Sequence, residues 1–160
     1  MKSTILASAA LAFATLGLAA CSDEPTPEAD DRDTAEEGIS ITDGRLVLPA
    51  VAGNPGALYF TVHNDGARDR FIRSASVEGA QSAILHQMGT WNGQPSMDEV
   101  MQIAVPTGGQ LVFEPGGLHV MANELDETLA AGGQTEVTIT FVGGRTATFP
   151  AEIRAAGDER

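Results

Sequence analysis

Apolar and polar residues alternate with a period of two through short runs from residue 39 onward. The clearest runs are LYFTVH at residues 58–63 and EVTITF at residues 136–141. Such alternation is typical of β-strands that bury one face and expose the other. A helical period is absent, except that Asn123 to Ala131 could hold one short helical turn. The pattern therefore predicts a domain built of strands.

Turn signals rich in Gly, Asn and Asp separate these runs. Seven of them supply the positive φ angles that tight connections need: Asp43-Gly44, Asn64-Asp65-Gly66, Asn92-Gly93, Gly108-Gly109, Pro115-Gly116-Gly117, Gly132-Gly133 and Gly143-Gly144. Seven connections predict seven or eight strands. We therefore expect an all-β fold, an antiparallel β-sandwich with Greek-key connections.

The N-terminus has the pattern of a targeting segment. Lys2 precedes sixteen uncharged residues, ILASAALAFATLGLAA, which predicts a signal peptide over residues 1–20. A permanent membrane span is the weaker alternative, because the run is short and an acidic flank follows it.

The junction Leu18-Ala19-Ala20-Cys21 resembles a bacterial lipobox. The resemblance implies that Cys21 becomes the acylated first residue of a lipoprotein on the periplasmic side of a bacterial membrane. Ser22 after the cysteine favours the outer membrane, although Asp23 leaves the sorting open. The alternative is an unlipidated protein, soluble in the periplasm.

Composition changes sharply after the cysteine. Residues 21–38 contain eight acidic residues, one Arg and two Pro, and no large apolar side chain, so they cannot form a core. We expect an acidic, flexible tether, with an acidic partner-binding tail as the alternative. Residues 39–154 are long enough for one hydrophobic core, and residues 155–160 form a short tail.

Charge and cysteine content exclude several functions. The chain has 22 Asp and Glu against 9 Lys and Arg, a net charge of −13, which excludes nucleic-acid binding and electrostatic binding to anionic lipid. The membrane is therefore contacted only through the lipid anchor. A single cysteine cannot build a disulfide, a thiolate zinc site or an iron–sulfur cluster. No nucleophile elbow occurs, so a hydrolase is a weak interpretation, and no phosphate loop or dinucleotide motif occurs either.

The remaining candidates for chemistry are imidazole and thioether groups. His119 and Met121 form an HxM pair, and His86 and Met88 form another. Residues two apart on a strand share one face, so each pair presents nitrogen and sulfur together. Thioether sulfur and imidazole suit soft Cu(I), whereas a blue-copper site needs a Cys thiolate that this domain lacks. Copper redox catalysis is the weakest alternative.

The spacing H-x10-M-x21-HxM of His86, Met97, His119 and Met121, with the PGGLHVM segment, resembles the periplasmic PCuAC copper chaperones. The resemblance covers about residues 40–153 and includes the stretch YFTVHNDG. It implies a cupredoxin-like sandwich that binds one Cu(I) through those four residues and is not an enzyme. It also implies delivery to the CuA site of cytochrome c oxidase, alongside Sco-type thiol proteins. The C-terminal tail lacks His and Met, so we expect one copper per chain, and we expect a monomer.

Several alternatives remain open from the sequence. Met88 and Met101 either pack in the domain or supply auxiliary sulfur. His63 is expected to be a solvated strand residue. Trp91 either shields the metal or covers an end of the sandwich. The rival functions are a copper-sequestering or resistance lipoprotein without a dedicated acceptor, and an interaction lipoprotein that binds no metal.

Overall fold

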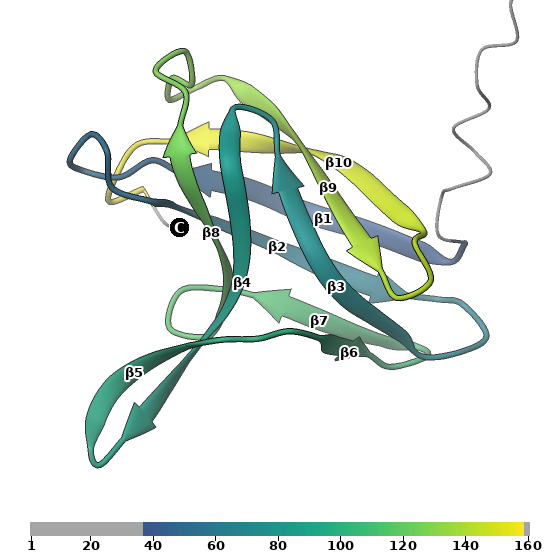
Figure 1. Ribbon diagram of the computed structural model, residues 1–160. Coiled ribbons are helices and arrows are strands. Elements are labelled where there is room, and N and C mark those ends of the chain that lie inside the picture. The colour runs from purple at the N-terminus through teal and green to yellow at the C-terminus, as the bar shows by residue number, and fades with distance from the viewer. Residues whose placement is uncertain (1–36, 159–160) are drawn as a thin grey trace, which may run out of the picture. The chain divides into compact units, whose positions relative to one another are not determined.

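The computed structural model describes residues 37–158, which form strands and connecting loops (Figure 1). The ten strands are β1 (Ile39–Val47), β2 (Gly56–Asn64), β3 (Arg70–Val77), β4 (Ala80–Trp91), β5 (Gln94–Glu99), β6 (Ile103–Val105), β7 (Gly109–Phe113), β8 (Leu118–Leu125), β9 (Gln134–Phe141) and β10 (Thr146–Arg154). Within this part of the chain, no helix is long and apolar enough to cross a bilayer. The all-β prediction is confirmed.

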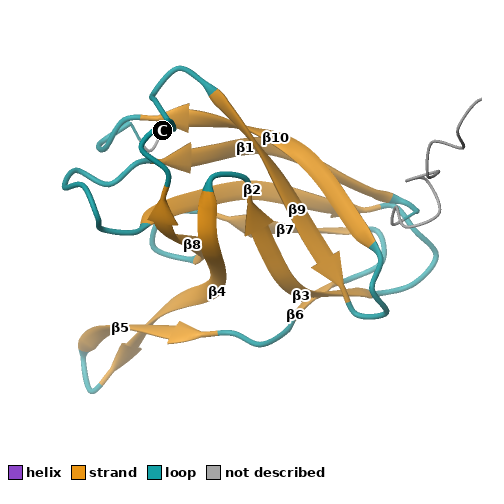
Figure 2. Cartoon of the chain, turned by 45° about the horizontal axis from the view of Figure 1, so that its top comes forward, coloured by secondary structure: helices purple, strands orange, loops and turns teal. Residues whose placement is uncertain are grey.

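The strands form one hydrogen-bonded sheet that curls around a core (Figure 2). Their order is β5-β4-β8-β7-β2-β1-β10-β9-β3-β6, and β8 also pairs with β2. Most pairings are antiparallel, as expected, but β1 and β10 pair in parallel, and so do β7 and β8 over a single register position. No tight turn joins β1 to β10, so their connection does not force the antiparallel direction.

The predicted number of strands is too low because turn signals and strand ends do not coincide. Asp43-Gly44 lies inside β1, at a register irregularity where Asp43 has φ 59°. A Cβ atom on Gly44 would lie 2.8 Å from the Phe149 ring, so only glycine lets the bulged strand pack this closely against Phe149. Conversely, the β5–β6 connection at residues 100–102 contains no Gly, Asn or Asp.

The possible helical turn in Asn123 to Ala131 is wrong. Its first three residues end β8, and the rest is a loop. Asp126 closes a turn there, because its side chain accepts a hydrogen bond from the Thr128 amide at 2.9 Å and its carbonyl accepts one from the Leu129 amide at 3.1 Å. The Thr128 amide also lowers the pKa of Asp126. Local side-chain bonding of this kind competes with helix formation.

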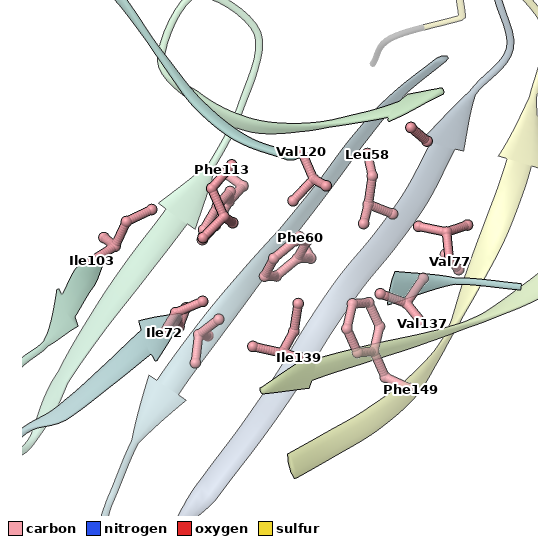
Figure 3. Packing of buried hydrophobic residues seen from close by; sticks show 14 of the residues in the cluster. Leu58, Phe60, Ile72, Val77, Ile103, Phe113, Val120, Val137, Ile139 and Phe149 are labelled. Atoms are coloured by element: carbon pink, nitrogen blue, oxygen red, sulfur yellow. The ribbon is translucent and has the colours of Figure 1, made fainter. Parts of the chain in front are cut away.

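The core includes three phenylalanine rings that pack together from β2, β7 and β10 (Figure 3). Phe60 of β2 is the register partner of Phe113 of β7, and their rings stack with centroids 4.2 Å apart. Phe149 of β10 packs against Phe60 at 5.2 Å. The predicted alternation holds in β9, where Val137, Ile139 and Phe141 are buried. In β2 Leu58, Phe60 and Val62 are buried as predicted, but so is Tyr59, which has Arg45 5.0 Å from its ring centre.

A buried asparagine fixes the connection after β2. The Asn64 side chain is fully buried and donates to the carbonyls of Arg68, at 3.0 Å, and Val105, at 2.9 Å. Its side-chain oxygen accepts the Gly66 amide at 3.1 Å. Asn64 therefore stabilises its own turn and ties it to β6, which explains a polar residue in the core.

The predictions about the signal peptide, about acylation of Cys21 and about nearly all of the acidic tether lie outside the described residues. They therefore stay predictions. The first described strand begins at Ile39 and the last ends at Arg154.

Candidate metal centre

Three neighbouring strands carry the residues that the sequence singles out. His86 lies on β4, Met97 on β5, and His119 and Met121 on β8, with β4 between the other two strands. His86 and His119 are register partners, so both side chains lie on one face of the sheet. The hairpin of β4 and β5 extends away from the rest of the domain (Figures 1 and 2). One hairpin and its neighbouring strand thus form the candidate site.

His119 is held in one orientation by the chain just before it. The side chain is only 8% exposed, and its Nδ1 lies 3.2 Å from the Gly117 carbonyl oxygen. A carbonyl can only accept a hydrogen bond, so Nδ1 carries the proton and Nε2 of the neutral ring keeps its lone pair. Metal-binding histidines are commonly oriented in this way.

The Pro-Gly-Gly turn produces this orientation. The Gly117 amide donates to the Glu114 carbonyl at 3.0 Å, and the Glu114 amide donates to the Leu118 carbonyl at 2.8 Å. Gly116 has φ 79°, a conformation that glycine adopts without strain. The Gly117 carbonyl also accepts the Met88 amide at 3.1 Å, which joins the turn to β4.

Met97 places sulfur beside the free nitrogen of His119. Its Sδ lies 3.2 Å from His119 Nε2, although the two residues are on strands separated by β4. Met97 is 43% exposed. The close pair of potential ligand atoms therefore has a buried side, formed by His119, and an open side, formed by Met97.

His86 contributes a buried nitrogen without a partner. Its Nδ1 is buried and makes no hydrogen bond to any described residue. The His86 and His119 rings are 5.8 Å apart between centroids, tilted by 57°. Buried polar atoms are usually satisfied, so an unpartnered nitrogen beside another imidazole is consistent with a missing ligand.

Met121 lies two residues beyond His119 on the same face of β8 and is half-buried. Its register partners are Ile84, in the first half of β4, and Ala57 of β2. Met121 therefore lies on the body of the domain, away from the projecting end of the β4–β5 hairpin. Met121 therefore flanks His119 on the side opposite to the hairpin.

The other residues that the sequence analysis named differ in exposure and in distance along the strands from the histidine pair. Met88 is half-buried and is the register partner of Met97, whereas Met101 is 77% exposed and lies beyond the end of β5. Trp91 is 73% exposed at the end of β4, on the opposite strand face from Met88, so neither predicted role fits its position. The half-buried His63 lies 3.3 Å from the Thr42 hydroxyl, on β2.

Two features were missed by sequence reasoning. The Gly117 carbonyl orients His119, and the glycine pair just before the HxM pair was its only signal. Glu99 is the register partner of His86. Because Glu99 follows Met97 by two residues on the same strand, the sequence could have shown that Glu99 and Met97 share a face. Within residues 37–158, no three His, Cys, Asp or Glu side chains form a metal-binding group.

This fold is that of PCuAC domains, a cupredoxin-like β fold. The copper-bound PCuAC domain from PmoF2 has a TM-score of 0.62 and 21% identity, over 76% of this chain and 96% of that one. The CuI-DR1885 solution structure from Deinococcus radiodurans has a TM-score of 0.59 and 23% identity, over 79% of this chain and 84% of that one. The predicted cupredoxin-like fold is thereby confirmed.

The chain belongs to the family described as "Putative lipoprotein LpqE-like", whose model matches residues 39–153. A curated relative, "Putative lipoprotein Lxx21020" of Leifsonia xyli subsp. xyli, is 26% identical over 151 residues. That alignment spans 94% of this chain and 90% of the relative.

Proposed function

We propose that this chain is an extracytoplasmic Cu(I) metallochaperone whose ligands are His86, Met97, His119 and Met121. The observation that carries the proposal is the 3.2 Å approach of His119 Nε2 to Met97 Sδ, beside the unpartnered Nδ1 of His86. Nitrogen and sulfur donors from three strands meet in one small region, on a fold that a copper-bound PCuAC domain shares.

The donor set selects the ion. Two neutral imidazoles and two thioethers favour a soft, singly charged ion, and they discourage zinc, magnesium and calcium. The 3.2 Å separation of His119 Nε2 and Met97 Sδ is short enough for one ion to bind both atoms. It therefore supports these two side chains as copper ligands.

The exposure of the ligands suggests how copper is handed over. Met97 is the accessible ligand, on the edge strand β5, whereas His119 is buried and hydrogen-bonded to Gly117. An acceptor can therefore approach from the Met97 side and replace the protein ligands one at a time, so the copper is never free. Each step exchanges one ligand for another, and Cu(I) is neither oxidised nor reduced.

We further propose that Cys21 is acylated and that the acidic segment after it tethers the domain to the periplasmic side of a membrane. The lipobox pattern and the "Putative lipoprotein" descriptions of the family and of the Leifsonia xyli relative support this proposal. The acceptor we propose is the CuA site of cytochrome c oxidase, with Sco-type thiol proteins as further partners. This acceptor rests on the PCuAC resemblance alone.

Anaerobic Cu(I) titration against a bicinchoninate chelator tests the binding site. We expect the wild type to bind one Cu(I), and Met97→Ala and His119→Ala each to weaken binding by about tenfold or more. Met101→Ala is the matched control, because this methionine is exposed outside the site and should leave the affinity unchanged. Binding that is absent, or unaffected by both site substitutions, would favour the interaction lipoprotein that binds no metal.

Transfer to an apo CuA domain separates a chaperone from a copper-sequestering protein. A chaperone passes copper through direct contact, so the transfer rate should rise with acceptor concentration and exceed the rate of spontaneous copper release. A sequestering protein would transfer no faster than it releases copper to a small chelator.

A further inference from the structure

A second pair of sulfur atoms lies next to the histidine pair, further out along the hairpin. Met88 of β4 is the register partner of Met97 of β5, one same-face position beyond His86. Directly opposed residues in an antiparallel pair project to the same face, so both thioethers lie on the face that carries the imidazoles. The face therefore holds more sulfur than a four-ligand site needs.

The hydrogen-bond pattern brings the two methionines close. The Val100 amide donates to the Leu85 carbonyl at 2.9 Å, which identifies these residues as a hydrogen-bonded pair. Hydrogen-bonded and non-bonded pairs alternate along an antiparallel ladder, so three positions further on Met88 and Met97 form a non-bonded pair. Side chains approach most closely in pairs of that type.

Met88 is also fixed relative to the histidine site. Its amide donates to the same Gly117 carbonyl that orients His119. Its side chain is half-buried, unlike that of Met101, which is 77% exposed. Met88 is thus tied to the site through both of its neighbouring strands, to Met97 on β5 and to the turn before β8.

We propose that Met88 and Met97 form an outer, transient Cu(I) position through which the ion enters and leaves the inner site. This inference rests on the proposed function. Met97 belongs to both positions, because its sulfur lies 3.2 Å from His119 Nε2 and it faces Met88 across the hairpin. The ion exchanges its bonds to His86, His119 and Met121 for a bond to Met88 and one to the incoming ligand, with no change of oxidation state.

An outer position of this kind changes rates more than affinity. The outer position lies on the route between bound and free copper. It therefore lowers the activation free energy of copper uptake and that of copper release by the same amount. Removing the Met88 sulfur should slow uptake and release together and leave the dissociation constant nearly unchanged. A fifth ordinary ligand would behave differently, since its loss would weaken equilibrium binding.

The test compares Met88→Leu with the matched control Met101→Leu in the full-length protein, using bicinchoninate as the copper acceptor. Leucine conserves apolar volume, so both variants should fold. Equilibrium competition gives the affinity, and stopped-flow absorbance of the chelator complex gives the transfer rate. We expect Met88→Leu to transfer copper about tenfold more slowly than wild type with its affinity within about threefold, and Met101→Leu to match the wild type in both.

Wild-type transfer rates in Met88→Leu would overturn the inference and leave the proposed function intact. A parallel loss of affinity in Met88→Leu would also overturn it, because Met88 would then be an ordinary ligand. Failure of the wild type to bind Cu(I) would instead overturn the proposed function itself.

Discussion

The carbonyl oxygen of Gly117 lies 3.2 Å from Nδ1 of His119, two residues further along the chain. This contact fixes the ring so that Nε2 points towards the sulfur of Met97. Because the oxygen also accepts the Met88 amide, one backbone carbonyl holds the ring and the strand of the hairpin together. The Pro-Gly-Gly turn therefore orients the His119 ring through the Gly117 carbonyl.

Gly116→Ala tests this role. A non-glycine residue at φ 79° is strained, so the substitution should destabilise the domain by about 1 kcal/mol. It should also displace the Gly117 carbonyl and weaken Cu(I) binding by about tenfold, in line with other losses of a ligand-orienting contact. Urea unfolding and chelator competition measure the two effects.

Gly132→Ala is the control, because Gly132 has φ 86° in a turn that contains none of the site residues, and an added Cβ would meet nothing within 4 Å. It should show the same loss of stability with normal copper affinity. Equal Cu(I) affinity in both variants would contradict a role of the Pro-Gly-Gly turn in copper binding.

His86→Leu should raise the stability of the copper-free domain. The buried Nδ1 of His86 has no hydrogen-bond partner among the described residues, and such an atom destabilises a fold by about 1–3 kcal/mol. Leucine removes that penalty, so we expect a gain of about 1 kcal/mol, together with loss of the stabilisation that Cu(I) gives the wild type. Thermal unfolding with and without Cu(I) measures both.

His63→Leu is the matched control on β2, since His63 has the Thr42 hydroxyl 3.3 Å away. It should keep the stabilisation by Cu(I) and show no comparable gain without copper. A His86→Leu variant that is less stable than wild type would show that the buried nitrogen is satisfied in solution.

The fold was largely predictable because one-sided burial leaves a clear period of two, as residues 136–141 illustrate. The number of strands was less predictable, because the Gly, Asn and Asp residues that indicate a turn between two strands also occur at a bulge inside one strand. Asp43-Gly44 satisfies the rules for a turn, yet the Phe149 ring beside Gly44 shows that tertiary packing decides its conformation.

The site was predictable in part. Strand period placed His119 with Met121, and His86 with Met88, but only the pairing of β4 with β5 and β8 brings Met97 to His119. Such pairing depends on contacts between residues distant in sequence, which local patterns do not encode. The PCuAC resemblance supplied Met97, and the ligand roles themselves stay predictions.

Asn64→Ala should destabilise the domain by about 2–4 kcal/mol. Removing this side chain leaves the buried Val105 carbonyl without its partner, and an unsatisfied buried group destabilises by about 1–3 kcal/mol. The Arg68 carbonyl and the Gly66 amide also lose a partner, but their bonds are only partly buried, so water can replace much of each and the two together add about 1 kcal/mol. Asn123→Ala is the control, because its side-chain contact to Ser82 is exposed and its hydrogen bond to the Met121 carbonyl is long, at 3.4 Å, so the loss should be below about 0.5 kcal/mol. Urea unfolding at neutral pH compares them, and equal losses would contradict a structural role for Asn64.

Trp91→Ala should leave copper binding and stability nearly unchanged. Trp91 is 73% exposed, and its partner Gln94 places it on the face of the hairpin opposite to Met88 and Met97. We therefore expect an affinity within about twofold of wild type and a stability change below about 0.5 kcal/mol. Because Trp91 is the only tryptophan, wild-type fluorescence should also be that of a water-exposed indole, before and after Cu(I) is added. A large loss of affinity, or a strong blue shift on binding, would instead mean that the hairpin folds over and the indole covers the ion.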